Sequence, residues 1–196
     1  MFVSGRGSNL QAILNSPDLQ NIVEVKAVVS DKTDCPAFEI AKKYSLPVYS
    51  VGNAEKKIGF TELSSLLLEK KTDLIVLAGF LKLLPVSFVE VFRNKIINIH
   101  PALLPSFGGS GMYGMNVHKA VFNSSAKVSG ATVHFVDEKF DNGMIIAQKC
   151  VDISSVSTPE DIAAKVLEIE HKLLPEIIEK FAFGKVVVDG SRVLVS

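Results

Sequence analysis

Asn98 and His100 are the residues whose types and spacing best suit chemistry. Side chains two residues apart on a strand project to the same face, so an extended segment places this amide and imidazole side by side. The apolar run 96–99 predicts a buried parallel strand, and open α/β sheets bind ligands beyond the carboxyl ends of such strands. A buried amide and imidazole there need hydrogen-bonding partners, which either a ligand or the surrounding protein supplies.

The segment Gly5-Arg6-Gly7-Ser8-Asn9 is a candidate phosphate-binding turn, because it lies where a strand gives way to a helix. Free backbone N–H groups and the positive end of the helix dipole bind anions at such a place. Leu10 stands where the dinucleotide pattern has its third glycine, and no Walker lysine follows. A single phosphate therefore fits better than a pyrophosphate. The alternative is a tight turn capped by Ser8 or Asn9, without a ligand.

Three further polar residues are candidates for the same site. Asp141 lies in the turn 137–143, although acidic, glycine-containing turns are also common as plain surface structure. His134 alternates with hydrophobic residues and either supports the site from behind or faces outward. Glu170 falls in the apolar row of a predicted helix, where its carboxylate needs a ligand hydroxyl or an ordinary salt bridge.

The first half of the chain alternates apolar runs of strand length with segments of helical period. This pattern predicts an α/β fold with a doubly wound, mostly parallel twisted sheet and helices on both faces. We expect helices at 9–15, 37–44 and 60–70, and strands at 23–30, 48–50, 73–78 and 96–99. Only Met1, Phe2 and Val3 precede Ser4, so the first strand is shorter than the usual 5–6 residues. Either the start is trimmed or this strand is weak.

The second half begins with a glycine-rich segment, 107–116, which predicts a mobile loop before a short helix at 117–123. Strands at 130–136 and 144–153 are expected to be antiparallel, since their connection is too short for a crossover. A long helix should start at Pro159, with Thr158 as its N-cap, and a hairpin should span 186–195. No repeat or linker is evident, so residues 1–196 are predicted to form a single domain.

Composition excludes several classes of partner and site. Lys plus Arg equals Asp plus Glu at 21 each, which disfavours nucleic acid or an anionic membrane as a partner. The only cysteines, Cys35 and Cys150, lack zinc-site or disulfide-framework spacing and are expected as thiols in the core. We also expect no metal. No signal sequence or membrane span is evident, which predicts a cytoplasmic protein.

Taken in order, five segments of the chain resemble the folate-dependent formyltransferases. They are residues 4–10 (SGRGSNL), 77–81 (LAGFL), 97–105 (INIHPALLP), 132–136 (TVHFV) and 141–143 (DNG). Each segment is modestly specific, whereas the ordered set spans nearly the whole chain. The resemblance implies transfer of the formyl group of 10-formyltetrahydrofolate to the amine of glycinamide ribonucleotide, as in purine biosynthesis. It also implies a Rossmann-like formyltransferase fold, small-molecule substrates, and a monomer or a homodimer.

The resemblance also implies roles for individual residues. Asn98, His100 and Asp141 fall on the family's catalytic amide, imidazole and carboxylate, which stabilise an oxyanion and move a proton without a metal. Residues 1–95 would form the phosphate-binding half and residues 96–196 the catalytic and folate-binding half. Substrate phosphate and ribose would be held by Gly7, Ser8, Asn9 and Glu170. The folate slot would be lined by Phe80, Leu81, Lys82, Leu83, Leu84 and Phe140.

Other functions share parts of this pattern. A formyltetrahydrofolate hydrolase and a methionyl-tRNA formyltransferase share the Asn-x-His and Asp elements, but each usually carries an additional domain that 196 residues cannot hold. A non-catalytic nucleotide-binding module would use Gly5, Gly7 and Asp31 to bind NAD. The resemblance assigns no residue to the family's additional phosphate-binding arginine, and Lys56 or Lys57 is the candidate to replace it.

Overall fold

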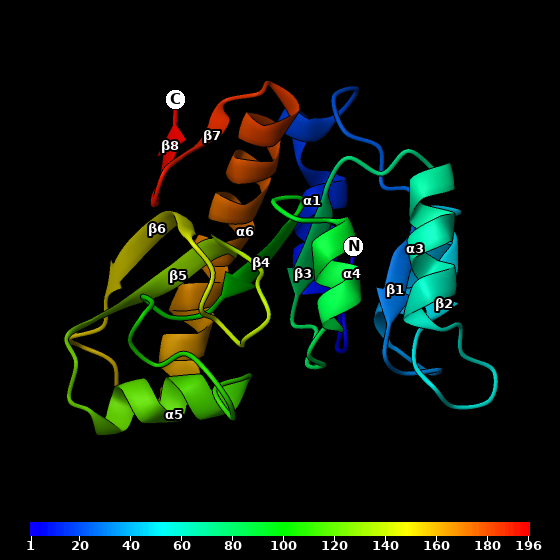
Figure 1. Cartoon of the computed structure of the whole chain (residues 1–196). Coiled ribbons are helices and arrows are strands. Elements are labelled where there is room, and N and C mark those ends of the chain that lie inside the picture. Colours follow the sequence, from blue (N-terminus) through cyan, green and yellow to red (C-terminus); the bar gives the residue numbers. More distant parts are fainter.

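The centre of the molecule is a sheet that joins parallel and antiparallel strands (Figure 1). The computed structural model describes residues 1–196. In it, β1 (Val28–Ser30) pairs in parallel with β2 (Val48–Ser50), and β3 (Ile75–Ala78) pairs in parallel with β4 (Ile96–His100). Phe2 connects these two pairs through parallel bridges to Val29 and Leu77. The short N-terminal segment therefore works as the strand between β1 and β3.

Beyond β4 the sheet continues with antiparallel strands. β5 (Val128–Phe135) pairs with β4, and β6 (Ile145–Asp152) pairs with β5. The register places Asn98 opposite His134 and His100 opposite Thr132. The predicted α/β class, a doubly wound, largely parallel sheet with antiparallel strands toward the C-terminus, is confirmed.

The helices cover both faces of the sheet. They are α1 (Ser8–Asn15), η1 (Pro17–Leu19), α2 (Ala37–Lys43), α3 (Phe60–Glu69), α4 (Val86–Val91), α5 (Met115–Asn123) and α6 (Pro159–Ala182), and the chain closes with the hairpin β7 (Val186–Asp189) and β8 (Arg192–Val195). One hydrophobic cluster packs α5 and α6 against the sheet, and a second packs α3 and α4 against its other face. None of these helices has the length and apolarity that crossing a membrane requires.

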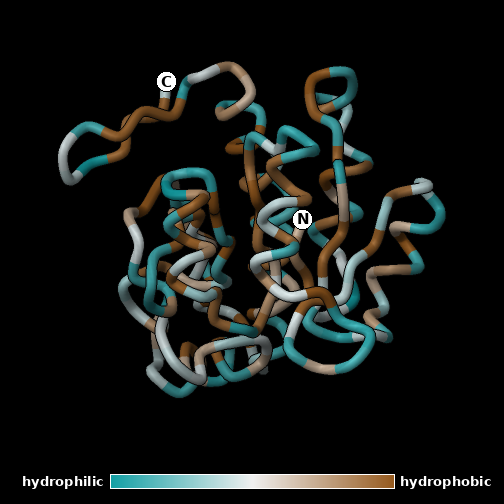
Figure 2. Tube along the Cα trace, turned by 45° about the vertical axis from the view of Figure 1, so that its right-hand side comes forward, coloured by the Kyte–Doolittle hydropathy of each residue, from teal (hydrophilic) through white to brown (hydrophobic).

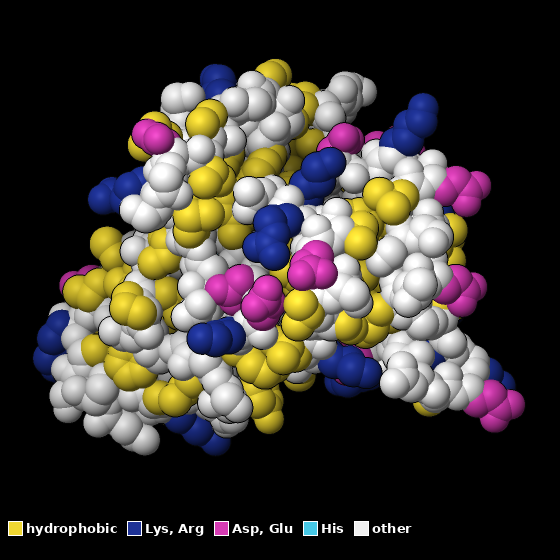
Figure 3. All heavy atoms as spheres, viewed as in Figure 1, with side chains coloured by type: hydrophobic (Ala, Val, Ile, Leu, Met, Phe, Trp, Pro, Cys, Tyr) yellow, Lys and Arg dark blue, Asp and Glu magenta, His cyan; other side chains and the backbone are white.

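Strand periodicity divides the core between these two clusters. Ile75 and Leu77 of β3 belong to the α3 and α4 cluster, whereas Val76 and Ala78 belong to the α5 and α6 cluster. A parallel strand buried on both faces is apolar at every position, as β3 is. In Figure 2 hydrophobic residues recur along the inner trace, and hydrophilic residues gather in the peripheral turns. On the face drawn in Figure 3, positive and negative side chains are interspersed.

The long helix begins as its sequence predicts. The Thr158 hydroxyl accepts from Asp161 N–H at 3.1 Å, and the Asp161 carboxylate accepts from Thr158 N–H at 2.9 Å. This reciprocal capping box, with Pro159 at the first helical position, satisfies backbone donors that a helix start otherwise leaves unpaired.

Several predicted elements differ from those observed. The strand expected at 23–30 covers only Val28–Ser30, and the strand expected at 73–78 starts at Ile75. Both are shortened at the end where the N-terminal segment gives them no neighbour. Sequence patterns also missed α4 and η1, which are short. Cys35 is buried as expected, but Cys150 is exposed on β6, so the prediction of two core thiols was wrong for Cys150.

Gly143 fits against β5 so closely that a side chain there should destabilise the fold. A Cβ at this position would lie 1.9 Å from the Phe135 carbonyl oxygen, and backbone cannot move away cheaply. Gly143→Ala should cost about 1–3 kcal/mol and lower the melting temperature by roughly 2–4 °C per kcal/mol in thermal unfolding. Gly59→Ala, where a Cβ has open space, is the matched control. Equal melting temperatures for the two variants would contradict this packing.

Candidate active site

A cavity of about 480 Å³ lies at the carboxyl ends of β3 and β4. Open α/β sheets bind ligands at this place. The lining comes from segments that are far apart in the sequence: residues 5–9, 78–81, 98–101 and 109–114, with His118, Phe140, Asp141 and Glu170. The cavity therefore joins the predicted phosphate turn, the Asn98 and His100 strand end and the acidic turn in one place.

The centre of the site is the Asp141 carboxylate, which lies between two imidazoles. Asp141 Oδ2 is 3.4 Å from His100 Nδ1, and Asp141 Oδ1 is 3.6 Å from His134 Nε2. The Asp141 side chain is only 11% exposed, and the imidazoles are 4% and 2% exposed. Low exposure strengthens the attraction between a carboxylate and a protonated imidazole, because little water screens it.

Two segments hold Asp141 in this position. The backbone N–H of Gly109, in the glycine-rich loop, donates to Asp141 Oδ2 at 2.9 Å. Asp141 itself has φ 53°, a left-handed conformation that Asp adopts more readily than most residues. That conformation turns the acidic segment back toward the sheet instead of leaving its carboxylate in solvent.

The same loop also contacts His100. The Phe107 carbonyl oxygen lies 2.8 Å from His100 Nε2, so Nε2 must carry the hydrogen that this oxygen accepts. Asp141 on the Nδ1 side can accept a second hydrogen. With an acceptor on each side, the charged imidazolium is the form that makes both hydrogen bonds.

Burial and charge act against each other in the pKa values of this pair. Burial is the largest influence on His100 and lowers its pKa, while Asp141 and the Phe107 carbonyl raise it, and the net pKa lies below the usual value. Burial raises the pKa of Asp141, but hydrogen bonding from His134, the charge of His100 and the Gly109 N–H together bring it below its usual value. Asp141 is therefore ionised at neutral pH, and the charge on His100 depends on keeping that carboxylate near.

His134 connects the carboxylate to Asn98. Its Nδ1 donates to the Phe135 carbonyl oxygen at 2.7 Å, which leaves Nε2 facing the Asn98 amide nitrogen at 3.1 Å. Nε2 lies between the Asn98 amide and Asp141 Oδ1, so it accepts from Asn98 when the ring is neutral and donates to Asp141 only when the ring is protonated. The second amide hydrogen of Asn98 stays available on the cavity side. His134 is buried behind the cavity and does not line it.

The phosphate turn occupies the other end of the cavity. Gly7 is the N-cap of α1 with φ 78°, and a Cβ there would lie 2.7 Å from Ala37 Cβ, so only glycine fits. The α1 helix starts at Ser8 and has no side-chain cap, which leaves its first backbone N–H groups for an anion. Asn9 Nδ2 donates to Glu170 Oε2 at 2.6 Å. Glu170 is thus paired with Asn9 and not with the salt-bridge partner that the sequence left open.

Ser4 fixes the geometry between the turn and the loop after β3. Its hydroxyl donates to Asp31 Oδ1 at 2.5 Å and accepts from the Leu81 N–H at 3.1 Å. Asp31 is therefore engaged by Ser4, which weakens the reading in which Asp31 binds a dinucleotide ribose. Lys57 donates to the Asp31 carbonyl oxygen and does not line the cavity.

The residues predicted for a folate slot separate into two groups. Phe80, Leu81 and Phe140 line the cavity, and Leu81 and Phe140 are 44% and 43% exposed. Lys82, Leu83 and Leu84 do not line it, and Leu84 is buried in the α3 and α4 cluster. After Leu81 the chain turns away from the cavity, so the side chains that follow no longer line it.

His118 is a cavity residue that sequence reasoning missed. It lies on α5, is 6% exposed, and its Nδ1 is buried without a hydrogen-bonding partner. Burial first, and the charge of His100 second, lower its pKa. Its position just after the glycine-rich loop was the one sequence feature that indicated a site residue. A histidine on a short amphipathic helix does not by itself indicate a functional role.

Comparison with known proteins defines the class. The family model for formyl transferases matches residues 1–178, and the chain belongs to this family. A phosphoribosylglycinamide formyltransferase of Bacillus subtilis (strain 168) is 35% identical over 184 residues, which are 92% of each chain. A crystal structure of phosphoribosylglycinamide formyltransferase from Anaplasma phagocytophilum superimposes with a TM-score of 0.88 at 34% identity, over 100% of this chain and 92% of the other.

A plant relative is longer than this chain. The chloroplastic phosphoribosylglycinamide formyltransferase of Arabidopsis thaliana is 43% identical over 183 residues, which are 91% of this chain and 63% of the plant protein. The chain thus spans less than two thirds of that relative's length.

Glu170 should make stability depend on pH. Burial raises its pKa to about 7 from 4.5, although the hydrogen bond from Asn9 acts in the opposite direction. Between these values the folded protein holds a proton that the unfolded chain has lost, so the Glu170 contribution to stability falls as pH rises from about 4.5 to 7. Glu170→Gln removes this loss, which is roughly 3 kcal/mol at most.

Thermal unfolding at pH 5 and pH 8 measures this effect. The melting temperature of Glu170→Gln minus that of the unmodified protein should be several degrees larger at pH 8 than at pH 5. Glu168→Gln, an exposed position on the same helix, is the control and should show no such change. A pH-independent difference for Glu170→Gln would show that this carboxyl titrates normally.

Proposed function

We propose that the protein transfers the formyl group of 10-formyltetrahydrofolate to the amine of 5'-phosphoribosylglycinamide. The products are formylglycinamide ribonucleotide and tetrahydrofolate, a step of purine biosynthesis. The observation that carries this proposal is the convergence of Asn98, His100 and Asp141 in a cavity whose other end is the phosphate turn. The relatives in the formyl transferase family that are named phosphoribosylglycinamide formyltransferase support the same formyl acceptor.

The reaction requires a group that stabilises negative charge on oxygen. When the amine nitrogen bonds to the formyl carbon, the carbonyl electron pair moves to oxygen and the nitrogen becomes positive. The unshared amide hydrogen of Asn98 and the Nε2 hydrogen of His100 donate to this oxygen. The oxyanion takes the place of the Phe107 carbonyl on His100, so the glycine-rich loop shifts when the substrate is bound.

The second requirement is a path for the proton. Asp141 favours the charged imidazole of His100 against the effect of burial and, directly or through a water molecule, accepts the proton of the amine. Collapse of the intermediate re-forms the carbonyl and breaks the bond from carbon to the folate nitrogen, which takes up the proton. His134 supports this step from behind by orienting Asn98 and Asp141. The mechanism needs no metal.

The residues that would bind the two substrates fall into two groups. Backbone N–H groups of Gly7, Ser8 and Asn9 bind the phosphate, and Glu170 accepts from the ribose hydroxyls. Leu81 and Phe140 offer exposed apolar surface for the pteridine ring, and the buried Phe80 lines the cavity beside them. Residues 1–95 then supply mainly the phosphate end and residues 96–196 the reacting groups. Both proposed substrates are small molecules. The cytoplasmic location of the protein and its state as a monomer or homodimer remain predictions from the sequence.

Formyl transfer should depend on the amine substrate. Purified protein with 10-formyltetrahydrofolate should release tetrahydrofolate only when 5'-phosphoribosylglycinamide is present, since the amine is the acceptor. The change in folate absorbance measures release, and mass analysis identifies the formylated product. Release without the amine would favour a formyltetrahydrofolate hydrolase. No release in either case, together with binding of nicotinamide cofactors in titration, would favour the nucleotide-binding module.

His100→Ala separates chemistry from binding. Loss of one donor to an oxyanion typically lowers turnover on the order of 100- to 1,000-fold, so kcat should fall by at least that amount. Affinity for the ribonucleotide, measured by calorimetry, should change little because the phosphate turn is intact. His171→Ala, which removes an imidazole outside the cavity, is the control. Unchanged kcat in His100→Ala would remove this residue from the mechanism.

A further inference from the structure

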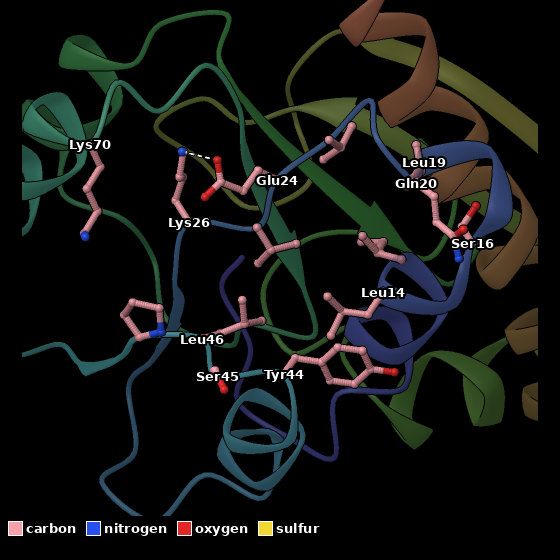
Figure 4. Close-up of a pocket in the computed structure, with 14 residues that line it drawn as sticks. Leu14, Ser16, Leu19, Gln20, Glu24, Lys26, Tyr44, Ser45, Leu46 and Lys70 are labelled. Atoms are coloured by element: carbon pink, nitrogen blue, oxygen red, sulfur yellow. Dashed lines mark hydrogen bonds and ion pairs between the residues drawn. The ribbon is translucent and has the colours of Figure 1, made fainter.

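A cavity of about 640 Å³ lies outside the candidate active site, between residues 23–26, the end of α1 and the residues after α2 (Figure 4). Its Lys26 is paired with Glu24, and none of its charged side chains is buried. No residue that lines it has a buried side-chain polar atom without a hydrogen bond. This cavity therefore has no buried polar group that a ligand would have to satisfy.

The active-site cavity differs in this respect. Asn9 Oδ1 and His118 Nδ1 are both buried without a hydrogen-bonding partner, and both residues line the cavity. Asn9 already contacts Glu170 through its amide nitrogen, at the proposed ribose end. The His118 imidazole makes no hydrogen bond with the protein, and the reaction proposed above does not use it. Buried polar groups are normally hydrogen-bonded, so an unpaired imidazole at the wall of a cavity indicates a ligand.

His118 lies on the buried face of α5, together with Val117 and Val121. The two valines belong to the core cluster that packs α5 and α6 against the sheet. His118 thus has apolar neighbours on its own helix and lies at the boundary between the core and the cavity. An unpaired imidazole in the place of an apolar side chain costs stability, and such costs are typical of functional sites.

The two ring nitrogens of His118 have different surroundings. Nδ1 is enclosed by protein, whereas Nε2 is not enclosed and therefore faces the cavity. Burial and, secondly, the charge of His100 lower the pKa of His118, so the ring is neutral at neutral pH. Inside proteins an N–H without an acceptor is rarer than an acceptor without a donor, which places the single hydrogen on Nε2. The imidazole therefore presents an uncharged N–H donor to the cavity.

The position of His118 limits which substrate atom can accept this hydrogen bond. His100 is close enough for its charge to act on His118, so the acceptor lies near the reacting end of the site. In the proposed substrate the phosphate is assigned to the turn at Gly7 and the ribose hydroxyls to Glu170. The glycinamide carbonyl oxygen is left without a donor, and its carbon is bonded to the carbon that carries the reacting amine. An uncharged donor suits this uncharged amide oxygen.

We propose that His118 is a substrate-binding residue that donates from Nε2 to the glycinamide carbonyl oxygen. This inference rests on the proposed function and adds a residue to it. A fixed carbonyl restricts rotation about the bond to the amine-bearing carbon, which directs the amine nitrogen toward the formyl carbon. A neutral His118 also adds no positive charge that would oppose the charged form of His100.

Two substitutions at His118 test this role in turnover. His118→Phe keeps a planar ring and removes the donor, whereas His118→Gln keeps an N–H near the position of Nε2. In His118→Phe, kcat/KM for the ribonucleotide should fall roughly 3- to 10-fold, the effect of one uncharged hydrogen bond. The KM for 10-formyltetrahydrofolate should not change, and His118→Gln should recover most of the loss. Lys119→Gln, an exposed neighbour on α5, is the control and should behave as the unmodified protein.

Calorimetry with two ligands tests the assignment without turnover. His118→Phe should weaken binding of 5'-phosphoribosylglycinamide by roughly the same factor. It should leave binding of ribose 5-phosphate, which lacks the glycinamide, unchanged. Equal weakening of both ligands would overturn the assignment to the carbonyl oxygen. If the unmodified protein bound ribose 5-phosphate but not the glycinamide compound, the proposed function itself would fail.

Thermal unfolding separates a substrate-binding histidine from a structural one. His118→Phe replaces an unpaired buried polar ring with an apolar one, so its melting temperature should equal or exceed that of the unmodified protein. His118→Leu, with a smaller apolar side chain, repeats the measurement without the larger ring. Lower melting temperatures in both variants, with unchanged kcat/KM and ribonucleotide affinity, would show that His118 only supports the fold and would overturn the proposal.

Discussion

The rest of the site depends on a carboxylate held between two imidazoles in a nearly dry environment. Asp141 contacts His100 on one side and His134 on the other. A buried charge is stable only when it is paired and hydrogen-bonded, so every neighbour of Asp141 is constrained by it. The left-handed backbone at Asp141, the Gly109 N–H and the register of β5 against β4 all serve this one placement.

That placement also explains why the glycine-rich loop belongs to the site. The loop donates to Asp141 through Gly109 and accepts from His100 through the Phe107 carbonyl. It thus contacts both members of the ion pair. Gly108 illustrates how closely the loop packs there, since a Cβ at this residue would lie 3.2 Å from Asp141 Cβ and 2.4 Å from Leu104 Cδ2. Substitution in the loop therefore perturbs the charges at the centre, not only access to the cavity.

Much of this protein was readable from local sequence. The continuous apolar run of β3, the Thr158 capping box and the Asp189–Gly190 turn are short-range signals, and each predicts its element, although β3 starts at Ile75 and not at residue 73. The pairing of Asn98 with His100 on one strand face follows from a period of two. Family membership was equally readable, because the ordered motifs lie in segments whose local structure forces particular residues, such as glycine at Gly7.

Long-range contacts decided what those local signals left open. Only the fold shows that Asp141 faces inward, that Glu170 pairs with Asn9, that His118 enters the cavity and that Lys82, Leu83 and Leu84 leave it. The shortened β1 also depends on its neighbour, since a strand forms only where an adjacent strand bonds to it. Sequence period determines which face a side chain takes, whereas its partner is set by packing between residues far apart in the chain, which no local pattern encodes.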